Sequence, residues 1–431
     1  MTATLTMSSK NLDQWLAYIE ACHPQEIDLG LERIKKVARV LGLTSLNCPV
    51  VTVAGTNGKG STIAYMAEVL SQAGYRFGCY TSPHFLRYNE RIVTNGRPVE
   101  DKALCDAFCC IEIARESLAV ALTYFEYGTL AALILFKRAE LDVVLLEIGL
   151  GGRLDAVNII DPDIAIVTTV AIDHESWLGS DREQIGFEKA GVYRPDRPAL
   201  YGEKNIPGSV LKHAETIAAK LYHWGDQFAG EKTAECWQWR GRDNAGGLVV
   251  IDDISYPTLP FENASTAIQA LKLLNLNIDN QSIRDGIAAA TLTGRCQRIV
   301  INGREVILDV AHNPHAAIHL VEQLANVEGA FHAVIGMLAD KDIASTLEQL
   351  KRRVNHWYPA TLKVARGQDG LSLQLALTVA GVNTGLIYPA DSVVAAFDQA
   401  LKNSAKGDKI LVVGSFVTVA QVLEYLGDEH Q

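Results

Sequence analysis

Hydrophobic residues recur in two patterns along the chain. Short continuous runs of Val, Ile and Leu, such as residues 143–146 and 164–170, predict buried strands. Segments with apolar residues at spacings of three and four, such as residues 62–73 and 182–190, predict helices. Because such strands alternate with helices, we expect an α/β fold with a mostly parallel sheet covered on both faces.

The same hydrophobic patterns predict a peripheral antiparallel region, a domain boundary and the remaining helices and strands. Residues 233–254 are polar and carry short β patterns, which predicts peripheral antiparallel strands. We place a domain boundary near Leu292, which divides the chain into a larger domain at 1–292 and a smaller α/β domain at 293–431. Further strands are predicted at 77–80, 306–310, 332–335 and 410–413, and further helices at 12–22, 31–41, 100–117, 130–138, 261–274, 282–290, 314–324, 343–352, 392–401 and 417–426.

One glycine-rich segment has the context of a phosphate-binding loop. Residues 51–61 read VTVAGTNGKGS, so a predicted strand runs into glycines and then into a predicted helix. Glycines let backbone N–H groups surround an anion, and the helix N-terminus favours negative charge. Lys59 would reach the β/γ-phosphates and a hydroxyl would hold Mg²⁺. The alternative, a glycine-rich turn without a ligand, is disfavoured by the flanking strand and helix.

This segment departs from the general loop pattern at two places. Val53 stands where the usual pattern has a glycine, and Gly60 separates Lys59 from the hydroxyl of Ser61.

Polar residues follow several other predicted strands. Ser82, Glu147 and His174 each come soon after one, and parallel sheets bind ligands at the carboxyl ends of their strands. A capped strand end explains any one of them alone, but together they predict a nucleotide and metal site. Oxygen ligands from Ser82 and Glu147 suit Mg²⁺, whereas the His174 nitrogen is a less usual ligand.

The predicted second domain contains a further motif. Residues 309–314 read DVAHNP, which is compatible with a capping turn that has proline at the helix start. They are equally compatible with a second set of nucleotide contacts. Arg295 and Arg298 are likewise either solvated surface charges or phosphate contacts, so both interpretations stay open here.

Composition and net charge limit the kinds of partner and the cellular location that we expect. A net charge of −11 over 431 residues argues against general nucleic-acid binding. No run reaches the 18 apolar residues expected of a membrane span, and the N-terminus lacks a signal-peptide pattern, so no membrane association is expected. Eight scattered cysteines without a C-x-x-C pair predict reduced thiols and a cytoplasmic location.

In combination, six segments resemble the folylpolyglutamate synthases, which are ATP-dependent amide ligases similar to the Mur peptidoglycan ligases. Gly60, which departs from the general loop, is what this family has. Residues 28–33 (DLGLER) and 122–126 (LTYFE) resemble the bifunctional form, which is both dihydrofolate synthase and folylpolyglutamate synthase. The resemblance runs from Asp28 to the end and rests on residues 55–61, 81–84, 147–155, 173–174, 188–191 and 309–314.

The resemblance implies a P-loop NTPase-like, ATP-binding domain of the Mur-ligase central type at 1–292, followed by a smaller Rossmann-like glutamate-ligase domain at 293–431. It also implies a defined reaction. L-glutamate would be ligated to dihydropteroate and to reduced folates, with ATP and Mg²⁺, through an acyl phosphate. It also implies K⁺ as a further cation and a monomeric protein. A Mur-type ligase is a rival, disfavoured because only 54 residues precede Gly55, where those enzymes carry a whole extra domain. A non-catalytic P-loop switch or binding module is the other rival.

Residue roles follow from the resemblance by position. The residues implied to bind ATP phosphates are Thr56, Asn57, Gly58, Lys59, Gly60 and Ser61, and those implied to make further ATP contacts are Asn263, Arg295 and Asp309. The implied Mg²⁺ ligands are Ser82, Glu147 and His174, and the implied catalytic residues are Lys59, Lys189 and His312. The residues implied to contact dihydropteroate are Asp28, Leu29, Gly30, Thr123, Tyr124, Phe125, Glu126, Leu154, Asp155 and Ala156.

Lys189 lies on a predicted helix shortly after His174. Considered alone, it is an ordinary helical lysine that pairs with a carboxylate or extends to solvent. The resemblance instead implies that CO₂ carbamylates it. An ammonium beside Mg²⁺ would repel the metal, and burial would lower the lysine pKa. The neutral amine can react with CO₂, and the resulting carbamate offers two anionic oxygens to the metal.

Overall fold

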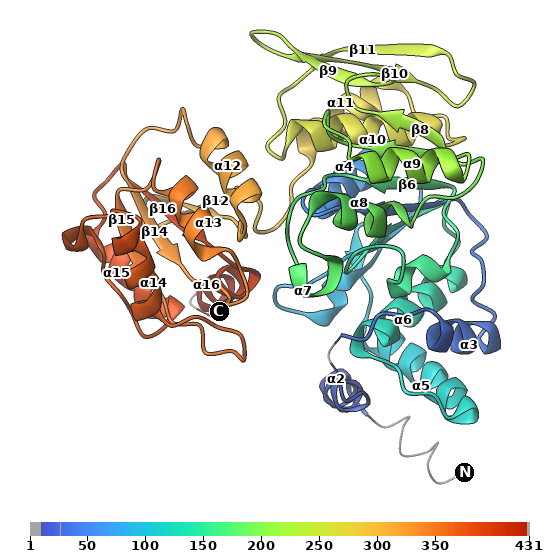
Figure 1. The fold of residues 1–431 in the computed structure, drawn as a ribbon, viewed down its shortest axis with the longest axis horizontal. Helices are drawn as coiled ribbons and strands as arrows, with labels where there is room; N and C mark the ends of the chain where they lie inside the picture. The colour runs from blue at the N-terminus through green and yellow to red at the C-terminus, as the bar shows by residue number, and fades with distance from the viewer. Residues whose placement is uncertain (1–9, 26, 429–431) are drawn as a thin grey trace. The chain divides into compact units, whose positions relative to one another are not determined.

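The structure is a computed structural model that describes residues 10–25 and 27–428. Its contacts divide the chain into two compact units, Met1–Ala290 and Thr291–Gln431 (Figure 1). The boundary predicted from the sequence lies two residues further on, after Leu292. Among the described residues, no helix combines the length and apolar character needed to span a membrane.

The first unit is built around an eight-stranded sheet with the order β4-β3-β2-β5-β1-β6-β7-β8. The six strands from β2 to β8 in this order are parallel, whereas β3 and β4 add an antiparallel edge. Every residue of β1 and β5 is buried, as expected for strands covered on both faces. The strand bounds are β1 Val50–Ala54, β2 Phe77–Tyr80, β3 Ile92–Thr94, β4 Arg97–Pro98, β5 Val143–Glu147, β6 Ile164–Val167, β7 Pro198–Tyr201 and β8 Lys220–His223.

Helices cover this sheet (Figure 1). The bounds are α2 Leu12–Ala21, α3 Glu32–Val40, α4 Lys59–Gln72, η1 Tyr88–Arg91, α5 Asp101–Leu118, α6 Tyr124–Arg138, η2 Ala156–Ile159, α7 Glu175–Leu178, α8 Arg182–Ala190, α9 Gly208–Thr216, α10 Phe261–Leu273 and α11 Asn280–Ala289.

Three predicted boundaries in this unit are wrong by three residues or more. Helix α4 begins at Lys59 rather than at residue 62. Helix α6 begins six residues earlier than predicted because Thr123 and Glu126 form a capping box: the Thr123 N–H donates to Glu126 at 2.7 Å and the Glu126 N–H to the Thr123 hydroxyl at 3.3 Å. Strand β6 ends at Val167 rather than at residue 170, because the next residues turn toward the phosphate loop described below.

A small antiparallel sheet with the order β11-β10-β9 packs on α10 and α11, which confirms the antiparallel strands predicted for residues 233–254. The Trp239 indole N–H of β10 donates to the Ser265 carbonyl of α10 at 3.1 Å. The bounds are β9 Ala229–Lys232, β10 Trp237–Arg242 and β11 Leu248–Ile254.

The second unit contains a five-stranded sheet with the order β12-β13-β16-β14-β15. All neighbours are parallel except β12 and β13, which form a hairpin. The sequence did not predict α14 or the two edge strands of this sheet, β12, which lacks buried residues, and β15, which is four residues long. The bounds are β12 Gln297–Ile301, β13 Arg304–Leu308, α12 Pro314–Gln323, β14 Phe331–Ile335, α13 Ile343–Leu350, β15 His356–Pro359, α14 Gly370–Val379, η3 Thr384–Leu386, α15 Val393–Asn403, β16 Lys409–Val413 and α16 Phe416–Asp428.

Candidate active site

The glycine-rich segment forms a tight loop between β1 and α4. Gly55 and Gly58 both have positive φ, 146° and 87°. A Cβ on Gly55 would lie 1.9 Å from the Thr168 hydroxyl, and one on Gly58 would lie 2.6 Å from Oδ1 of Asn263. Both positions therefore require glycine, and the second brings the predicted nucleotide residue Asn263 against the loop.

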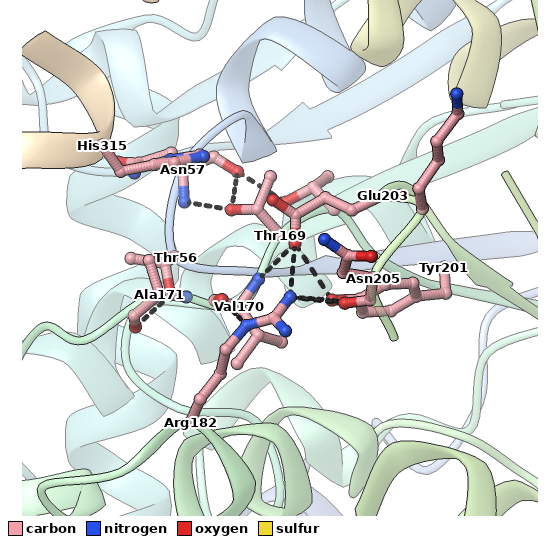
Figure 2. Close-up of polar contacts among 12 residues, drawn as sticks. Thr56, Asn57, Thr169, Val170, Ala171, Arg182, Tyr201, Glu203, Asn205 and His315 are labelled. Atoms are coloured by element: carbon pink, nitrogen blue, oxygen red, sulfur yellow. Dashed lines mark hydrogen bonds and ion pairs between the residues drawn. The ribbon is translucent and has the colours of Figure 1, made fainter. Parts of the chain in front are cut away.

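The loop is fastened to the segment that follows β6 (Figure 2). The Thr56 N–H donates to the Thr169 carbonyl at 2.9 Å, and the Thr56 hydroxyl both donates to the Ala171 carbonyl and accepts its N–H, at 3.0 and 3.1 Å. The Asn57 N–H donates to the Thr169 hydroxyl at 2.9 Å, and the Thr168 hydroxyl donates to the Asn57 carbonyl at 2.6 Å.

These bonds direct the N–H groups of Thr56 and Asn57 toward the β6 side of the loop. An anion is then best held by the first turn of α4, where a helix leaves its N–H groups without intrahelical partners. Gly60 and Ser61 lie in that turn, and Ser61 is buried. Sequence reasoning assigned no role to Thr168 and Thr169, because the predicted strand ran on to residue 170 and included both.

The Lys59 ammonium lies over this loop. Its Nζ donates to the Gly55 carbonyl at 3.1 Å and to the Thr56 carbonyl at 3.4 Å. Its charge also acts on two buried groups: it helps to lower the pKa of Lys189 and opposes the rise in the pKa of Asp155. Lys59 is thus placed to meet a phosphate held at the start of α4.

Lys189 and Asp155 are buried ionisable groups near this lysine. Lys189 of α8 is only 4% exposed, and burial, followed by the charge of Lys59, lowers its pKa from 10.5 to about 7. The carboxylates of Asp173 and Asp155 oppose that shift. Burial raises the pKa of Asp155 to about 7, although its oxygens accept backbone N–H bonds from Leu150 and Val157. Four separate segments thus place two lysines and two aspartates within range of one another's charges.

Two of the three predicted metal ligands, Ser82 and Glu147, are in hydrogen-bonding contact. The Ser82 N–H donates to Oε2 of Glu147 at 3.0 Å, and Glu147 is the buried last residue of β5. Glu147 pairs in register with Val53 of β1, so its carboxylate lies at the strand end beside the phosphate loop. A buried carboxylate and a serine at this edge fit the oxygen ligands that Mg²⁺ prefers.

His174, the third predicted ligand, is more exposed. Its side chain is 40% exposed, its backbone has φ 53°, and its Nε2 lies 3.9 Å from Asp173. Within residues 10–25 and 27–428, no group of three or more His, Cys, Asp or Glu side chains is arranged to hold a metal. The predicted set includes only two residues of those types, so a role for His174 stays a prediction.

The three predicted pterin-binding segments converge in the first unit. The Gly30 N–H donates to the Leu154 carbonyl at 3.2 Å, which joins residues 28–30 to residues 154–156. The Arg33 guanidinium pairs with Asp28 at 2.5 Å and with the buried Glu126 at 2.9 Å. Burial raises the pKa of Glu126, and Arg33 opposes the shift. Sequence reasoning gave Arg33 no role of its own, yet it holds two of the segments together.

Aromatic rings line the same region. Phe125 packs on Tyr80 with ring centroids 5.9 Å apart, and Tyr124 meets Tyr88 edge-on at 5.6 Å. The Arg91 guanidinium lies 5.6 Å from the Tyr124 ring. Thr123 is the N-cap of α6 and Ala156 is buried in η2, while Leu29 and Leu154 are half-buried.

Two candidates of the second unit, Asp309 and Arg295, lie within range of each other's charges. Asp309 is buried and accepts the N–H groups of Cys296 and Ala311, both at 2.8 Å. Burial raises its pKa, and Arg295 opposes the shift. The Arg295 guanidinium also lies 5.1 Å from the Phe416 ring.

The remainder of this motif caps a helix. Asn313 is the N-cap of α12 and accepts the Ala316 N–H at 2.9 Å, with Pro314 as the first helical residue. His312 contacts the Val310 carbonyl through Nδ1 at 2.8 Å. The capping interpretation is therefore confirmed for Asn313 and Pro314, and the nucleotide contacts of this motif stay a prediction.

Known proteins resemble the chain along its whole length. The family model described as "Mur ligase, glutamate ligase domain" matches residues 294–416. The dihydrofolate synthase/folylpolyglutamate synthase of Escherichia coli (strain K12) is 45% identical over 417 residues, which cover 96% of this chain and 95% of that protein. The chain belongs to the dihydrofolate synthase/folylpolyglutamate synthase family. The predicted resemblance is confirmed, and with it the class of enzyme, an ATP-dependent amide-forming ligase.

Solved structures of this family share the fold. E. coli FolC in complex with DHPP and ADP superposes with a TM-score of 0.92 at 45% identity, covering 98% of this chain and 99% of that one. The bifunctional enzyme from Yersinia pestis CO92, complexed with AMPPNP and Mn ion, gives a TM-score of 0.90 at 43% identity over 97% and 99% of the two chains. The predicted α/β fold, a parallel-sheet P-loop domain followed by a smaller α/β domain, is thereby confirmed.

Proposed function

We propose that this member of the family ligates L-glutamate both to dihydropteroate, forming dihydrofolate, and to the terminal glutamate of reduced folates, with conversion of one ATP to ADP and phosphate per amide formed. The observation that carries the proposal is the convergence of three segments in the unit that also holds the phosphate loop. Arg33 joins Asp28 to Glu126, and Gly30 binds Leu154.

The reaction follows from this arrangement. A carboxylate oxygen of the pterin substrate attacks the γ-phosphorus of ATP, which forms an acyl phosphate and releases ADP. The amine of L-glutamate then attacks the acyl carbon, loses a proton and expels phosphate, which leaves an amide. Little covalent chemistry falls to the protein, so rate enhancement rests on positioning and on neutralising the spreading charge.

Side chains of the first unit supply those functions in this proposal. Lys59 neutralises charge on the transferring phosphoryl group, and the first turn of α4 binds phosphate oxygens through its N–H groups. Asn263 fixes the loop from the side of α10. In the second unit, Arg295 and Asp309 contribute to ATP binding and His312 to catalysis.

Glu147 and Ser82, with His174, are the residues we propose to hold Mg²⁺, and K⁺ is a further candidate cation. A divalent cation supplies charge neutralisation on the phosphates. The buried carboxylate of Glu147 beside the loop supports this assignment.

We further propose that Lys189 is carbamylated. Burial and Lys59 lower its pKa to about 7, so near neutral pH a large part of the amine is unprotonated. The nitrogen lone pair then attacks the carbon of CO₂ and the nitrogen loses a proton, which gives a carbamate anion. Its two oxygens would face Mg²⁺ and relieve the electrostatic conflict between Lys189 and Lys59.

The aromatic region supports a flat heterocycle as substrate. Tyr124 and Phe125 lie at the start of α6 beside Tyr80 and Tyr88, and aromatic rings stack on planar rings such as a pterin.

We propose that the protein acts as a monomer in the cytoplasm. All eight cysteines are free thiols, which suits a reducing compartment.

Two measurements test the proposal. ADP release that requires L-glutamate together with dihydropteroate or a reduced folate would support it, and ADP release with a nucleotide-sugar peptide acceptor, or none at all, would contradict it. Dihydropteroate labelled with ¹⁸O in its carboxylate should transfer one ¹⁸O to the released phosphate. Unlabelled phosphate would exclude the acyl phosphate.

A further inference from the structure

The segment after β6 is held in place by side chains. β6 ends at Val167, so the backbone groups beyond it leave the sheet and need other partners. The backbone N–H and carbonyl groups of Val170 both form hydrogen bonds with side chains (Figure 2). Its N–H donates to Oε2 of Glu203 at 3.1 Å, and its carbonyl accepts Nε–H of Arg182 at 2.7 Å.

The two side chains also bind each other. Arg182 Nη2 lies 3.3 Å from Oε2 of Glu203, and the same oxygen accepts the Tyr201 hydroxyl at 3.0 Å. Arg182 donates as well to the carbonyl of Asn205. Tyr201 is fully buried at the end of β7, so the ion pair is anchored to the sheet rather than free in solvent.

This ion pair connects two parts of the candidate site. Ala171, next to Val170, exchanges two hydrogen bonds with the Thr56 hydroxyl of the phosphate loop. Arg182 is the first residue of α8, and Lys189 lies seven residues later, two turns further on the same helix face. The pair therefore joins the phosphate loop to the helix that carries Lys189.

We propose that Arg182 and Glu203 are positioning residues that hold the phosphate loop in the shape that binds nucleotide. The proposal rests on the proposed function, because it takes ATP to bind at this loop. Without the pair, Val170 loses both side-chain partners. The neighbouring Ala171, which binds Thr56, is then less firmly placed, and the loop samples other shapes. Nucleotide binding must then restore the order, which weakens the apparent affinity.

The opposite end of the same strands offers a matched control. Arg197 pairs with Asp163 at 2.7 Å and donates to the Pro162 carbonyl at 2.9 Å, while Asp163 accepts the Val50 N–H at 2.8 Å. This pair also links an arginine, a carboxylate and strand backbone. It lies at the starts of β1 and β6, away from the phosphate loop.

The test is calorimetric titration of the full-length protein with ADP and Mg²⁺, together with thermal unfolding of each variant. We expect Arg182→Ala and Glu203→Gln to raise the Kd for ADP about ten-fold, the size of one lost charge-assisted contact. Arg197→Ala should change that Kd less than about two-fold, even where it lowers the Tm as much. Glu203→Gln, which keeps the shape of the side chain, carries the test if Arg182→Ala does not fold.

Two results would overturn the inference. One is an unchanged Kd for ADP in both Arg182→Ala and Glu203→Gln, and the other is an equal rise in Arg197→Ala. A wild-type protein that does not bind ADP would instead overturn the proposed function itself, so the two failures are distinguishable.

Discussion

Gly58 lies directly against the side-chain amide of Asn263. A Cβ on Gly58 would sit 2.6 Å from Oδ1 and 2.8 Å from Nδ2 of that residue, and its φ of 87° suits glycine alone. Asn263 is 5% exposed and lies in the first turn of α10. The close approach therefore fixes the start of α10 on the phosphate loop.

Gly58→Ala should separate this contact from backbone strain. Gly74 provides the control, because it has φ 75° and nothing lies within 4 Å of the position that a Cβ would take there. Both alanine variants should lose about 1–2 kcal/mol of unfolding free energy, because an L-residue is disfavoured at positive φ. Only Gly58→Ala should also raise the KM for ATP, about ten-fold or more, by displacing Asn263. Equal KM values in the two variants would show that the contact is unimportant for nucleotide binding.

Arg33→Ala should impair the pterin site selectively. Loss of the guanidinium releases Asp28 and leaves the buried Glu126 without its ion pair, which should cost about 1–3 kcal/mol of stability. We expect a higher KM for dihydropteroate and an unchanged KM for ATP. Arg76→Ala is the control, since Arg76 pairs with Glu140 and Asp142 on an exposed surface. A rise in both KM values, or in neither, would contradict the assignment.

Lys189 should make activity depend on pH. Its folded pKa of about 7 lies below the ordinary 10.5, so the neutral amine is lost as pH falls through 7. Carbamate formation and turnover should fall on the acid side with a midpoint near 7. The unfolded lysine binds its proton up to pH 10.5, so this group makes the folded protein more stable as pH rises from 7 to 10.5.

The modification itself can be observed. With ¹³CO₂, the wild-type protein should show a carbamate ¹³C resonance at about pH 8 that Lys189→Ala lacks. The variant should be nearly inactive and partly rescued by a small carboxylic acid, whereas Lys36→Ala, at an exposed helical lysine, should behave as wild type. A wild-type spectrum without the resonance would rule out the carbamate.

Arg295→Ala tests the contribution of the second unit. If Arg295 contacts phosphate, its loss should raise the KM for ATP or lower kcat with little change in Tm. Arg298 is the control, because it pairs with Glu305 on the neighbouring strand at 3.1 Å. A large drop in Tm with normal kinetics for Arg295→Ala would make its packing on Phe416 structural instead.

Local patterns predicted the parts of this molecule that depend on neighbours in sequence. β1 and β5 are buried on both faces, so their apolar runs were unambiguous, whereas the exposed edge strand β12 gave only a weak signal. The phosphate loop was recognisable because its residues are contiguous. The role of Arg33 was not, since its partner Glu126 lies 93 residues away and only the fold brings them together. The same applies to Thr168 and Asn57, which are 111 residues apart.

Analysis of products by mass spectrometry tests the central claim most directly. With ATP, Mg²⁺ and L-glutamate, the wild-type protein should convert dihydropteroate to dihydrofolate and lengthen a reduced folate by one glutamate, releasing one ADP per amide formed. Lys59→Ala should retain the fold, judged by circular dichroism, and lose about 10²–10⁴ in kcat with both substrates. Near-normal turnover by Lys59→Ala, or glutamylation of the reduced folate alone, would contradict a single phosphate-loop site that serves both reactions.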